Sequence, residues 1–351
     1  TSSAFGRTDA PVSIFYLLIQ ESEMHFKHLV GSLALCCSVG VVQAQTLTIY
    51  TYESFTSEWG PGPVLAEKFA ARCDCEVNFV GLEDGVALLN RLRLEGDQSQ
   101  ADIILGLDDG LMAEAKALGL MVDHGQDLSG LALPYAWNDN QFVPYDYGHF
   151  AFVYDATRVT KVPTSLRELV QESDLSVIYQ DPRVSTPGQG LMLWMKSVFG
   201  DQSGEAWQQL QQKTVTVTPG WSEAYALFQE GKSDMVLSYV TSPAYHLTWE
   251  DTDKYQAAEF SEGHYVQIEL AAAVASSQNL ELAQSFLAFL ISKPAQDVFA
   301  GTNWMWPVLA DAEKPAAFDQ LIQPKSLFFS SAEVAQNRRN WIKEWRNAAS
   351  Q

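Results

Sequence analysis

The residues of this chain that could do chemistry are mainly hydroxyl and aromatic side chains close to glycine or proline. Ser185-Thr186-Pro187-Gly188 has the composition of a helix N-terminus, with a hydroxyl residue as cap and proline in the first turn. Asp84-Gly85 and Thr241-Ser242-Pro243 have a similar pattern. Free backbone N–H groups at such helix ends bind anions when they point into a cleft. Ser185 and Thr186 are therefore the first candidates for a phosphate site, whereas the anionic Asp84 suits a cap or a cation.

Large aromatic side chains stand at the ends of predicted strands and in loops rich in glycine and proline. Aromatic residues of a core usually lie inside an element, so some of the rings at these edges are expected to face a cavity. Their planes hold flat heterocycles by stacking and cations by attraction to the ring quadrupole, each with roughly 0.5–2 kcal/mol. The candidates are Tyr52, Trp59, Trp221, Tyr239, Tyr245 and Trp304.

The elements that must position these residues alternate between strand and helix patterns. Residues 47–52, 75–80 and 102–106 have strand patterns, and residues 64–71 have the spacing of a helix. Such alternation predicts an α/β fold with a largely parallel sheet covered by helices. In that fold ligands bind at the ends of strands, which is where the candidate residues lie.

Residues 220–246 bring several candidates together in one short run of elements. A helix that includes Ala224 and Phe228 ends at Gly231, and an apolar strand follows over 235–239. A further helix begins at Thr241-Ser242-Pro243, with a hydroxyl residue as the N-cap and proline at the first helical position. This order places Trp221, Tyr239 and Ser242 at element ends.

Two long extended segments, residues 142–154 and 263–272, lack helical spacing and are rich in aromatic or apolar residues. We interpret them as crossings between two lobes. The predicted first lobe contains residues 45–148 and 273–351, and the second contains residues 149–272. A ligand cleft is expected between the lobes.

Composition excludes some classes of function. The 351 residues carry a net charge of −21, which argues against nucleic-acid binding because that requires a basic patch. An acidic surface is compatible with a cationic ligand. The chain has no G-x-S-x-G, S-x-x-K or H-E-x-x-H motif and no phosphate-binding loop, and its six His lack the spacing of metal ligands. The sequence therefore predicts neither a metal site nor a catalytic motif, with triads assembled from distant positions left open.

Residues 24–44 have the pattern of a cleavable export signal, with a weakly basic start at Met24 and a cut after Ala44. Residues 1–23 precede the expected start and are interpreted as an over-extended reading of the gene. The apolar run of the signal is too short for an ordinary transmembrane helix. Leu35 disfavours lipid attachment at the neighbouring Cys36 and Cys37.

The other two cysteines, Cys73 and Cys75, are separated by a single residue. In an exported protein they could form a small-ring disulfide if the chain turns tightly there, and otherwise they remain free. As a pair they supply too few ligands for a metal site.

A series of motifs resembles, in order and spacing, the periplasmic thiamine-binding proteins of bacterial thiamine ABC transporters over nearly all of residues 47–348. The motifs are Tyr50 to Tyr52, Glu58 to Pro63, Leu82 to Gly85, Leu89 to Leu92, Ala101 to Gly106, Tyr179 to Arg183, Ser185 to Pro187, Gly220 to Tyr225, Leu237 to Tyr239, Thr241 to Tyr245 and Asn303 to Met305.

The resemblance implies a two-lobed periplasmic-binding-protein fold of type II with two crossing segments. It implies a monomeric periplasmic receptor that binds thiamine, thiamine phosphate or thiamine diphosphate without any cofactor or catalysis. Such a receptor delivers thiamine to the membrane permease and ATPase subunits of an ABC importer.

Site residues follow from the same resemblance. Asp84 and Gly85 would contact the ligand, and Ser185 and Thr186 would hold its phosphate or hydroxyethyl end. At Val240 a hydroxyl residue would be expected, so only a backbone contact is implied there. The remaining pocket residues would be Trp221, Tyr239, Val240, Thr241 and Ser242, with Tyr52, Trp59, Tyr245 and Trp304 as aromatic walls.

Two alternatives are weighed against this function. A receptor of the same fold could bind ferric ion or a polyamine-like cation; ferric sites favour paired tyrosines, and here adjacent tyrosines are absent, though Tyr145 and Tyr147 lie close in sequence. An exported thiamine-degrading enzyme would need a nucleophile in the cleft, typically cysteine, and Cys73 and Cys75 precede a predicted strand.

Overall fold

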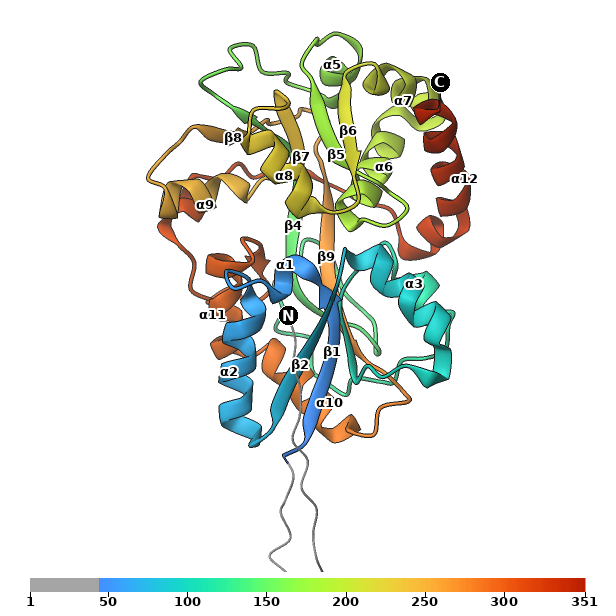
Figure 1. Cartoon of the computed structure of the whole chain (residues 1–351), viewed down its shortest axis with the longest axis vertical. Helices are drawn as coiled ribbons and strands as arrows, with labels where there is room; N and C mark the ends of the chain where they lie inside the picture. The colour runs from blue at the N-terminus through green and yellow to red at the C-terminus, as the bar shows by residue number, and fades with distance from the viewer. Residues whose placement is uncertain (1–43, 351) are drawn as a thin grey trace, which may run out of the picture. The chain divides into compact units, whose positions relative to one another are not determined.

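Two long strands organise the part of the chain that this computed structural model describes, residues 44–350. β4 (Val143–Asp155) and β9 (His264–Ala273) pair antiparallel, with Asp146 opposite Glu269, and are almost completely buried. Figure 1 shows them passing through the middle of the fold, between the strands of one half and those of the other. The prediction of two crossing segments is confirmed.

The strands follow the order β2-β1-β3-β9-β4-β7-β5-β6. The outer strands pair in parallel, β1 with β2 and β3, and β5 with β6 and β7. The crossing strands run antiparallel to each other and to β3 and β7, so the sheet is mixed, and the predicted parallel pairing holds for the outer strands and for the short β11 beside β9. The remaining strands are β1 (Thr46–Tyr52), β2 (Glu76–Leu82), β3 (Ile103–Asp108), β5 (Val177–Gln180), β6 (Thr214–Thr218), β7 (Met235–Tyr239), β8 (Tyr255–Ala257), β10 (Trp306–Pro307) and β11 (Ser326–Leu327).

Helices cover both faces of the sheet in the first half (Figure 1). On one face Phe69 of α2 packs edge-on against Phe286 of α10, with ring centroids 5.0 Å apart. On the other face Leu88 and Leu92 of α3 join a second apolar cluster. The helices of this half are α1 (Glu53–Thr56), α2 (Pro61–Cys73), α3 (Gly85–Glu95), α4 (Met112–Lys116), α10 (Leu280–Leu290) and α11 (Lys293–Thr302), with the 3₁₀ turns η1 (Gly96–Gln98) and η3 (Ala316–Gln320).

The second half has its own core around Trp194, which is fully buried and donates its indole N–H to the carbonyl of Gly263 at 3.1 Å. Its helices are α5 (Leu166–Gln171), α6 (Thr186–Phe199), α7 (Ser203–Gln211), α8 (Trp221–Gln229) and α9 (Ser242–Trp249), with the 3₁₀ turn η2 (Gly200–Gln202). Because the apolar residues of α6 face the sheet, the start of this helix is held beside the end of β5.

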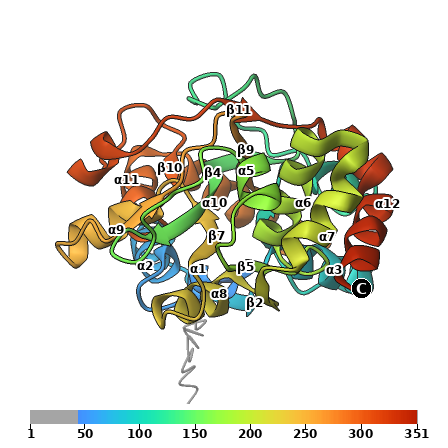
Figure 2. The same ribbon diagram turned by 90° about the horizontal axis from the view of Figure 1, so that it is seen from above.

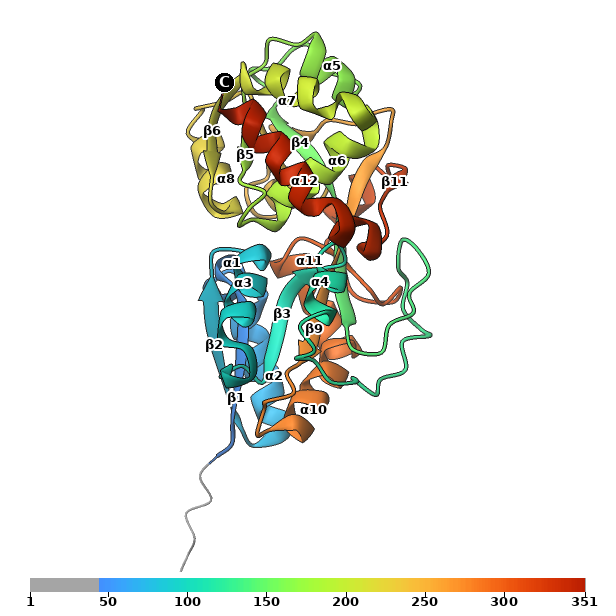
Figure 3. The same ribbon diagram turned by 90° about the vertical axis from the view of Figure 1, so that its right-hand side faces the viewer.

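The last helix, α12 (Ser331–Ala349), packs beside α6 and α7 of the second half (Figures 2 and 3). Its apolar stripe, with Trp341 and Trp345, is buried in the cluster around Trp194. The predicted division keeps this helix with the first lobe, and the helix also contacts α4 of the first half. The chain returns to the first half within β9 and before residue 273, because Glu269 to Ala273 already pair with β3 of that half. The exact lobe boundaries stay a prediction.

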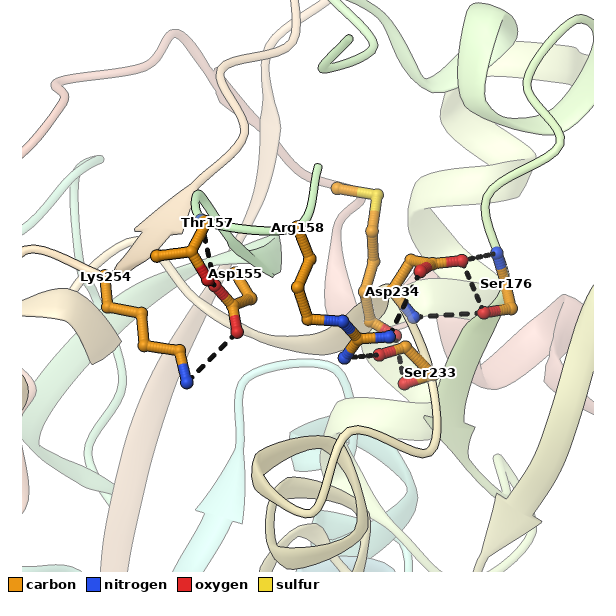
Figure 4. Close-up of polar contacts among 8 residues, drawn as sticks. Asp155, Thr157, Arg158, Ser176, Ser233, Asp234 and Lys254 are labelled. Atoms are coloured by element: carbon orange, nitrogen blue, oxygen red, sulfur yellow. Dashed lines mark hydrogen bonds and ion pairs between the residues drawn. The ribbon is translucent and has the colours of Figure 1, made fainter. Parts of the chain in front are cut away.

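A polar cluster fixes the far end of the second half (Figure 4). Asp234 accepts hydrogen bonds from the backbone N–H and the hydroxyl of Ser176 at 2.8 and 2.6 Å. Arg158 pairs with Asp234 at 3.5 Å and donates to the carbonyl of Ser233 at 3.3 Å. These contacts hold the starts of β5 and β7 together, at the opposite end of β7 from Tyr239.

The structure links Cys73 to Cys75 by a disulfide, with Cα atoms 5.1 Å apart and Asp74 between them in a left-handed conformation. The tight turn required for this bond is therefore present. Within residues 44–350, the helices are all too short or too polar to span a bilayer. The predictions for residues 1–23, for the signal up to its cleavage site and for Cys36 and Cys37 lie outside the described residues.

Candidate functional site

A cavity of about 320 Å³ lies between the two halves, where their strands end. All six aromatic residues predicted from the sequence contribute to its lining, from both halves of the fold. Of the predicted residues, those that line the cavity are Tyr52, Trp59, Asp84, Trp221, Tyr239, Ser242, Tyr245 and Trp304.

Trp221 stands at the start of α8 and forms one wall. Its ring stacks on Tyr225 with centroids 5.0 Å apart and planes 23° from parallel. Its indole N–H donates to the Ser238 hydroxyl at 2.8 Å, which fixes the orientation of the ring. Trp59, on the loop before α2 in the first half, lies 6.5 Å from Trp221 between ring centroids. This wall therefore closes only when the two halves are together.

A second aromatic corner forms where Tyr245 meets Trp304 at right angles, with centroids 5.5 Å apart. Trp304 follows α11 with φ 55°, a conformation that bulky residues rarely adopt. Its N–H bonds to the Phe299 carbonyl at 3.0 Å. The turn places Asn303, Trp304 and Met305 consecutively along the cavity. Backbone strain of this kind is concentrated at functional sites in proteins.

The carboxyl group of Glu269 lies at the cavity, although its residue is only 6% exposed. Its Oε2 accepts from the Tyr52 and Tyr145 hydroxyls at 2.8 and 2.6 Å, and its Oε1 accepts from the Gln267 amide at 2.9 Å. Burial raises the pKa of Glu269, and the bonds from the two tyrosines oppose that rise. Three donors therefore support a negative charge at this position.

Asp146 stands opposite Glu269 in the pairing of β4 with β9 and is completely buried. One oxygen, Oδ2, accepts from the Asn303 amide at 2.7 Å, and the other, Oδ1, is buried without a hydrogen-bond partner. Burial, followed by the charge of Glu269, raises the pKa of Asp146 well above its ordinary value. The two acids are close enough for one to suppress ionisation of the other.

Asp84 and Ser185 join the two halves beside the cavity. The Ser185 hydroxyl donates to Asp84 Oδ2 at 2.8 Å, while Asp84 Oδ1 accepts from the Gly85 N–H at 2.8 Å and caps α3. The N–H of Ala87 also donates to the Val184 carbonyl at 3.2 Å. A Cβ on Gly85 would lie 2.3 Å from the Thr186 hydroxyl oxygen, so glycine permits this approach of α3 to α6.

The other predicted contacts do not form part of the cavity wall in this structure. Ser185 is fully buried and its hydroxyl is taken by Asp84. The Thr241 hydroxyl is buried and makes no hydrogen bond, and α9 begins at Ser242, one residue before the predicted start at Pro243. The residues outside the wall are Gly85, Ser185, Thr186, Val240 and Thr241, and their contact with a ligand stays a prediction.

Sequence reasoning missed Glu269 and several further lining residues. Glu269 is the one carboxylate in an apolar ten-residue strand. Because a buried carboxylate is costly, its presence in such a strand indicates a functional role that the sequence could have revealed. For most of the others the sequence offers no signal, because they become neighbours only through the fold. The missed lining residues are Ser54, Glu83, Pro187, Ser222, Tyr225, Ala226, Gln229, His246, Glu269, Asn303 and Met305.

The lining has a clear charge preference. It contains Glu83, Asp84 and Glu269 but neither lysine nor arginine. His246 is bonded to Glu250 at 2.7 Å and to the Tyr225 hydroxyl at 2.8 Å, and burial lowers its pKa. Among residues 44–350, no group of three or more His, Cys, Asp or Glu is arranged to hold a metal ion. The cavity suits a flat organic cation better than a metal or an anion.

Several known proteins are similar to this chain in sequence. Residues 64–324 match the family of bacterial extracellular solute-binding proteins. The thiamine-binding periplasmic protein of Escherichia coli (strain K12) is 53% identical over 320 residues, covering 91% of this chain and 98% of that protein. The thiamine-binding periplasmic protein of Brucella suis biovar 1 (strain 1330) is 54% identical over 308 residues, covering 87% and 92%.

Solved structures of periplasmic binding proteins have the same fold as this chain. A periplasmic thiamin binding protein has a TM-score of 0.87 at 53% identity, covering 89% of this chain and 98% of the other. A ferric binding protein from Campylobacter jejuni has a TM-score of 0.73 at 16% identity, covering 86% and 99%. The second likeness shows a shared fold alone.

Proposed function

We propose that this chain, which belongs to the family of bacterial extracellular solute-binding proteins, captures thiamine and its phosphate esters in the cavity between its halves. The observation that carries the proposal is the cavity lining, in which aromatic rings and carboxylates come together without lysine or arginine. Thiamine combines a flat aminopyrimidine with a cationic thiazolium. Aromatic faces bind both rings, and the carboxylates favour the positive charge.

The proposed role is that of an exported periplasmic receptor. It would act as a monomer and hand thiamine to the permease and ATPase subunits of an ABC importer. The relatives named thiamine-binding periplasmic protein support this setting. Contacts across the cavity, such as Asp84 with Ser185 and Trp59 with Trp221, support capture by closure of two lobes.

We propose that the ligand is released unchanged. Thiamine cleavage by covalent catalysis would need a nucleophile at the cavity. In the described chain Cys73 and Cys75 are joined to each other, and neither is part of the cavity lining. Incubation with thiamine and an added nucleophile should therefore leave thiamine intact, as checked by mass spectrometry.

Isothermal titration calorimetry tests the proposed ligand directly. We expect saturable binding of one thiamine per chain, with binding of thiamine phosphate and diphosphate measured beside it. Ferric ion and a polyamine serve as the competing ligands. Saturable binding of either one without any binding of thiamine would contradict the proposal, and so would the absence of all binding by correctly folded protein.

A further inference from the structure

Within the proposed function, the acid pair formed by Glu269 and Asp146 suggests how the cavity chooses its ligand. We infer that Glu269 selects a positively charged ring, with Asp146 as the proton-carrying partner that keeps one negative charge on the pair. The inference rests on the proposed function, because it concerns recognition of the thiazolium in the same cavity.

The first argument is the way Glu269 is held. A carboxylate offers about four acceptor positions, and Tyr52, Tyr145 and Gln267 occupy three of them. The carboxylate is therefore a fixed charge with little free capacity to accept from a ligand. A quaternary thiazolium nitrogen carries no N–H and needs no acceptor, so a fixed charge is the complement that it requires.

The second argument is the state of Asp146. Its Oδ1 is buried without a donor, although buried carboxylate oxygens in proteins are normally hydrogen-bonded. If Asp146 is protonated, this oxygen becomes a donor to the carboxylate of Glu269, and the penalty for burying a second charge disappears. The direction of the pKa of Asp146, raised by burial and by Glu269, agrees with a neutral acid at neutral pH.

Within the acid pair, the surrounding groups favour charge on Glu269 over charge on Asp146. Tyr52 and Tyr145 donate to it, and burial raises the pKa of both phenols, so they stay protonated as donors. Asp108 on β3 stands opposite Glu269, and burial raises its pKa well above its ordinary value. Asp84 contributes a further repulsion that raises the pKa of Glu269. A cation in the cavity relieves the repulsion that this arrangement builds up.

The test compares thiamine with a neutral isostere in which a thiophene ring replaces the thiazolium. We expect wild-type protein to bind thiamine at least about tenfold more tightly than the isostere. Glu269→Gln keeps the size of the side chain and should lower thiamine affinity about tenfold or more, while changing isostere affinity by no more than about twofold. Calorimetry measures the dissociation constant of each ligand for the wild-type protein and for the variant.

Two further variants serve as controls. Asp146→Asn keeps an acceptor for Asn303 and the charge of Glu269, so thiamine affinity should fall less than in Glu269→Gln. Glu281→Gln removes an exposed carboxylate at the start of α10 and should change neither affinity. If Glu269→Gln fails to fold, the wild-type ratio of the two affinities still tests charge selection, because equal affinities would overturn it.

The outcomes separate the inference from the proposed function. Thiamine binding by wild-type protein with equal affinity for the isostere would overturn the charge selection and leave the proposed function standing. Equal losses for both ligands in Glu269→Gln would mean that Glu269 acts by hydrogen bonding or by shape. Failure of folded wild-type protein to bind thiamine would overturn both.

Discussion

At the scale of the residue, the orientation of Trp221 in the cavity wall is fixed by its bond to Ser238 and its stack on Tyr225. We expect Trp221→Ala to weaken thiamine binding by about 1.5–4 kcal/mol, the loss typical of a buried aromatic anchor. Trp221→Phe should lose less, because it keeps the stack on Tyr225 and gives up only the bond to Ser238. Titration calorimetry measures both losses.

Trp249 supplies the matched control for this prediction. It lies at the end of α9, is 69% exposed and is not part of the cavity lining. Trp249→Ala should leave the affinity for thiamine unchanged. If Trp221→Ala behaves in the same way as this control, then Trp221 is no ligand contact.

Glu269 also predicts how binding depends on pH. Burial raises its pKa above the ordinary 4.5, and its ionised form is the one that favours a cation. Thiamine affinity should therefore be constant near neutral pH and fall as the pH drops through that raised pKa. The neutral isostere carries the same aminopyrimidine and corrects for protonation of the ligand. Parallel pH profiles for the two ligands would contradict a role for Glu269 in the fall.

At the scale of the element, the starts of α3 and α6 meet through Asp84 and Ser185. The sequence favours a phosphate site at Ser185, which predicts a larger loss for thiamine phosphate than for thiamine in Ser185→Ala. The structure changes that expectation, because the hydroxyl bonds to Asp84 across the halves. A hydrogen bond to a charged group contributes about 1.5–3 kcal/mol, so we now expect similar losses of about tenfold or more for both ligands.

Ser165→Ala is the control for the loss of an N-cap alone. Ser165 caps α5 by accepting from the Glu168 N–H at 2.9 Å, wholly within the second half. Its removal should cost about 1 kcal/mol of stability and leave thiamine affinity unchanged. A loss in Ser185→Ala confined to the phosphate ester would return Ser185 to the role that the sequence suggests.

The start of β9 depends on the protonation state of His264. Its Nδ1 donates to the Phe150 carbonyl at 2.6 Å, and its Nε2 accepts from the Phe260 N–H at 2.9 Å, so the ring fits only as the neutral form. Burial lowers the pKa of His264 from 6.5 to about 4. The neutral ring therefore contributes up to about 3 kcal/mol above pH 6.5, and this is lost as the pH falls toward 4.

His264→Gln isolates that contribution in denaturant unfolding between pH 7 and pH 4. The variant should be less stable at pH 7, and its stability should fall less steeply with acid than that of wild-type protein. Other buried groups, such as Asp109 with a pKa raised by burial to about 6, titrate in both proteins and cancel in the difference. If the free energy of unfolding falls equally steeply with pH in the two proteins, His264 does not control acid stability.

The sequence predicts elements best where the pattern is local. The strand that became β1 and the helices that became α2 and α8 follow from periodicity, and the start of α3 follows from its cap at Asp84. The elements α7 and β6 are not predicted from local pattern, because α7 is a short helix stabilised by packing against α12 and β6 is a half-exposed edge strand. Glu269 and Asp146 could not be paired from sequence, since 123 positions separate residues that only the β4–β9 register brings together.

At the scale of the whole molecule, two apolar cores share β4 and β9. Phe150 and Phe152 of β4 belong to the core of the second half, while Val143 and Tyr145 of the same strand belong to the first. The strands therefore couple the stability of one half to that of the other. A ligand held between the halves contacts both, so its binding energy should stabilise the two cores together.

This coupling predicts a single unfolding transition for residues 44–350, and thiamine should move all of it. At a thiamine concentration of about 100 times the dissociation constant, the free energy of unfolding should rise by about 2.7 kcal/mol. Calorimetry reports the whole transition, and the combined fluorescence of the ten tryptophans can be compared with circular dichroism of all elements. A second transition that thiamine leaves in place would mean that the halves unfold independently, because the shared strands would then fail to carry the ligand's effect from one core to the other.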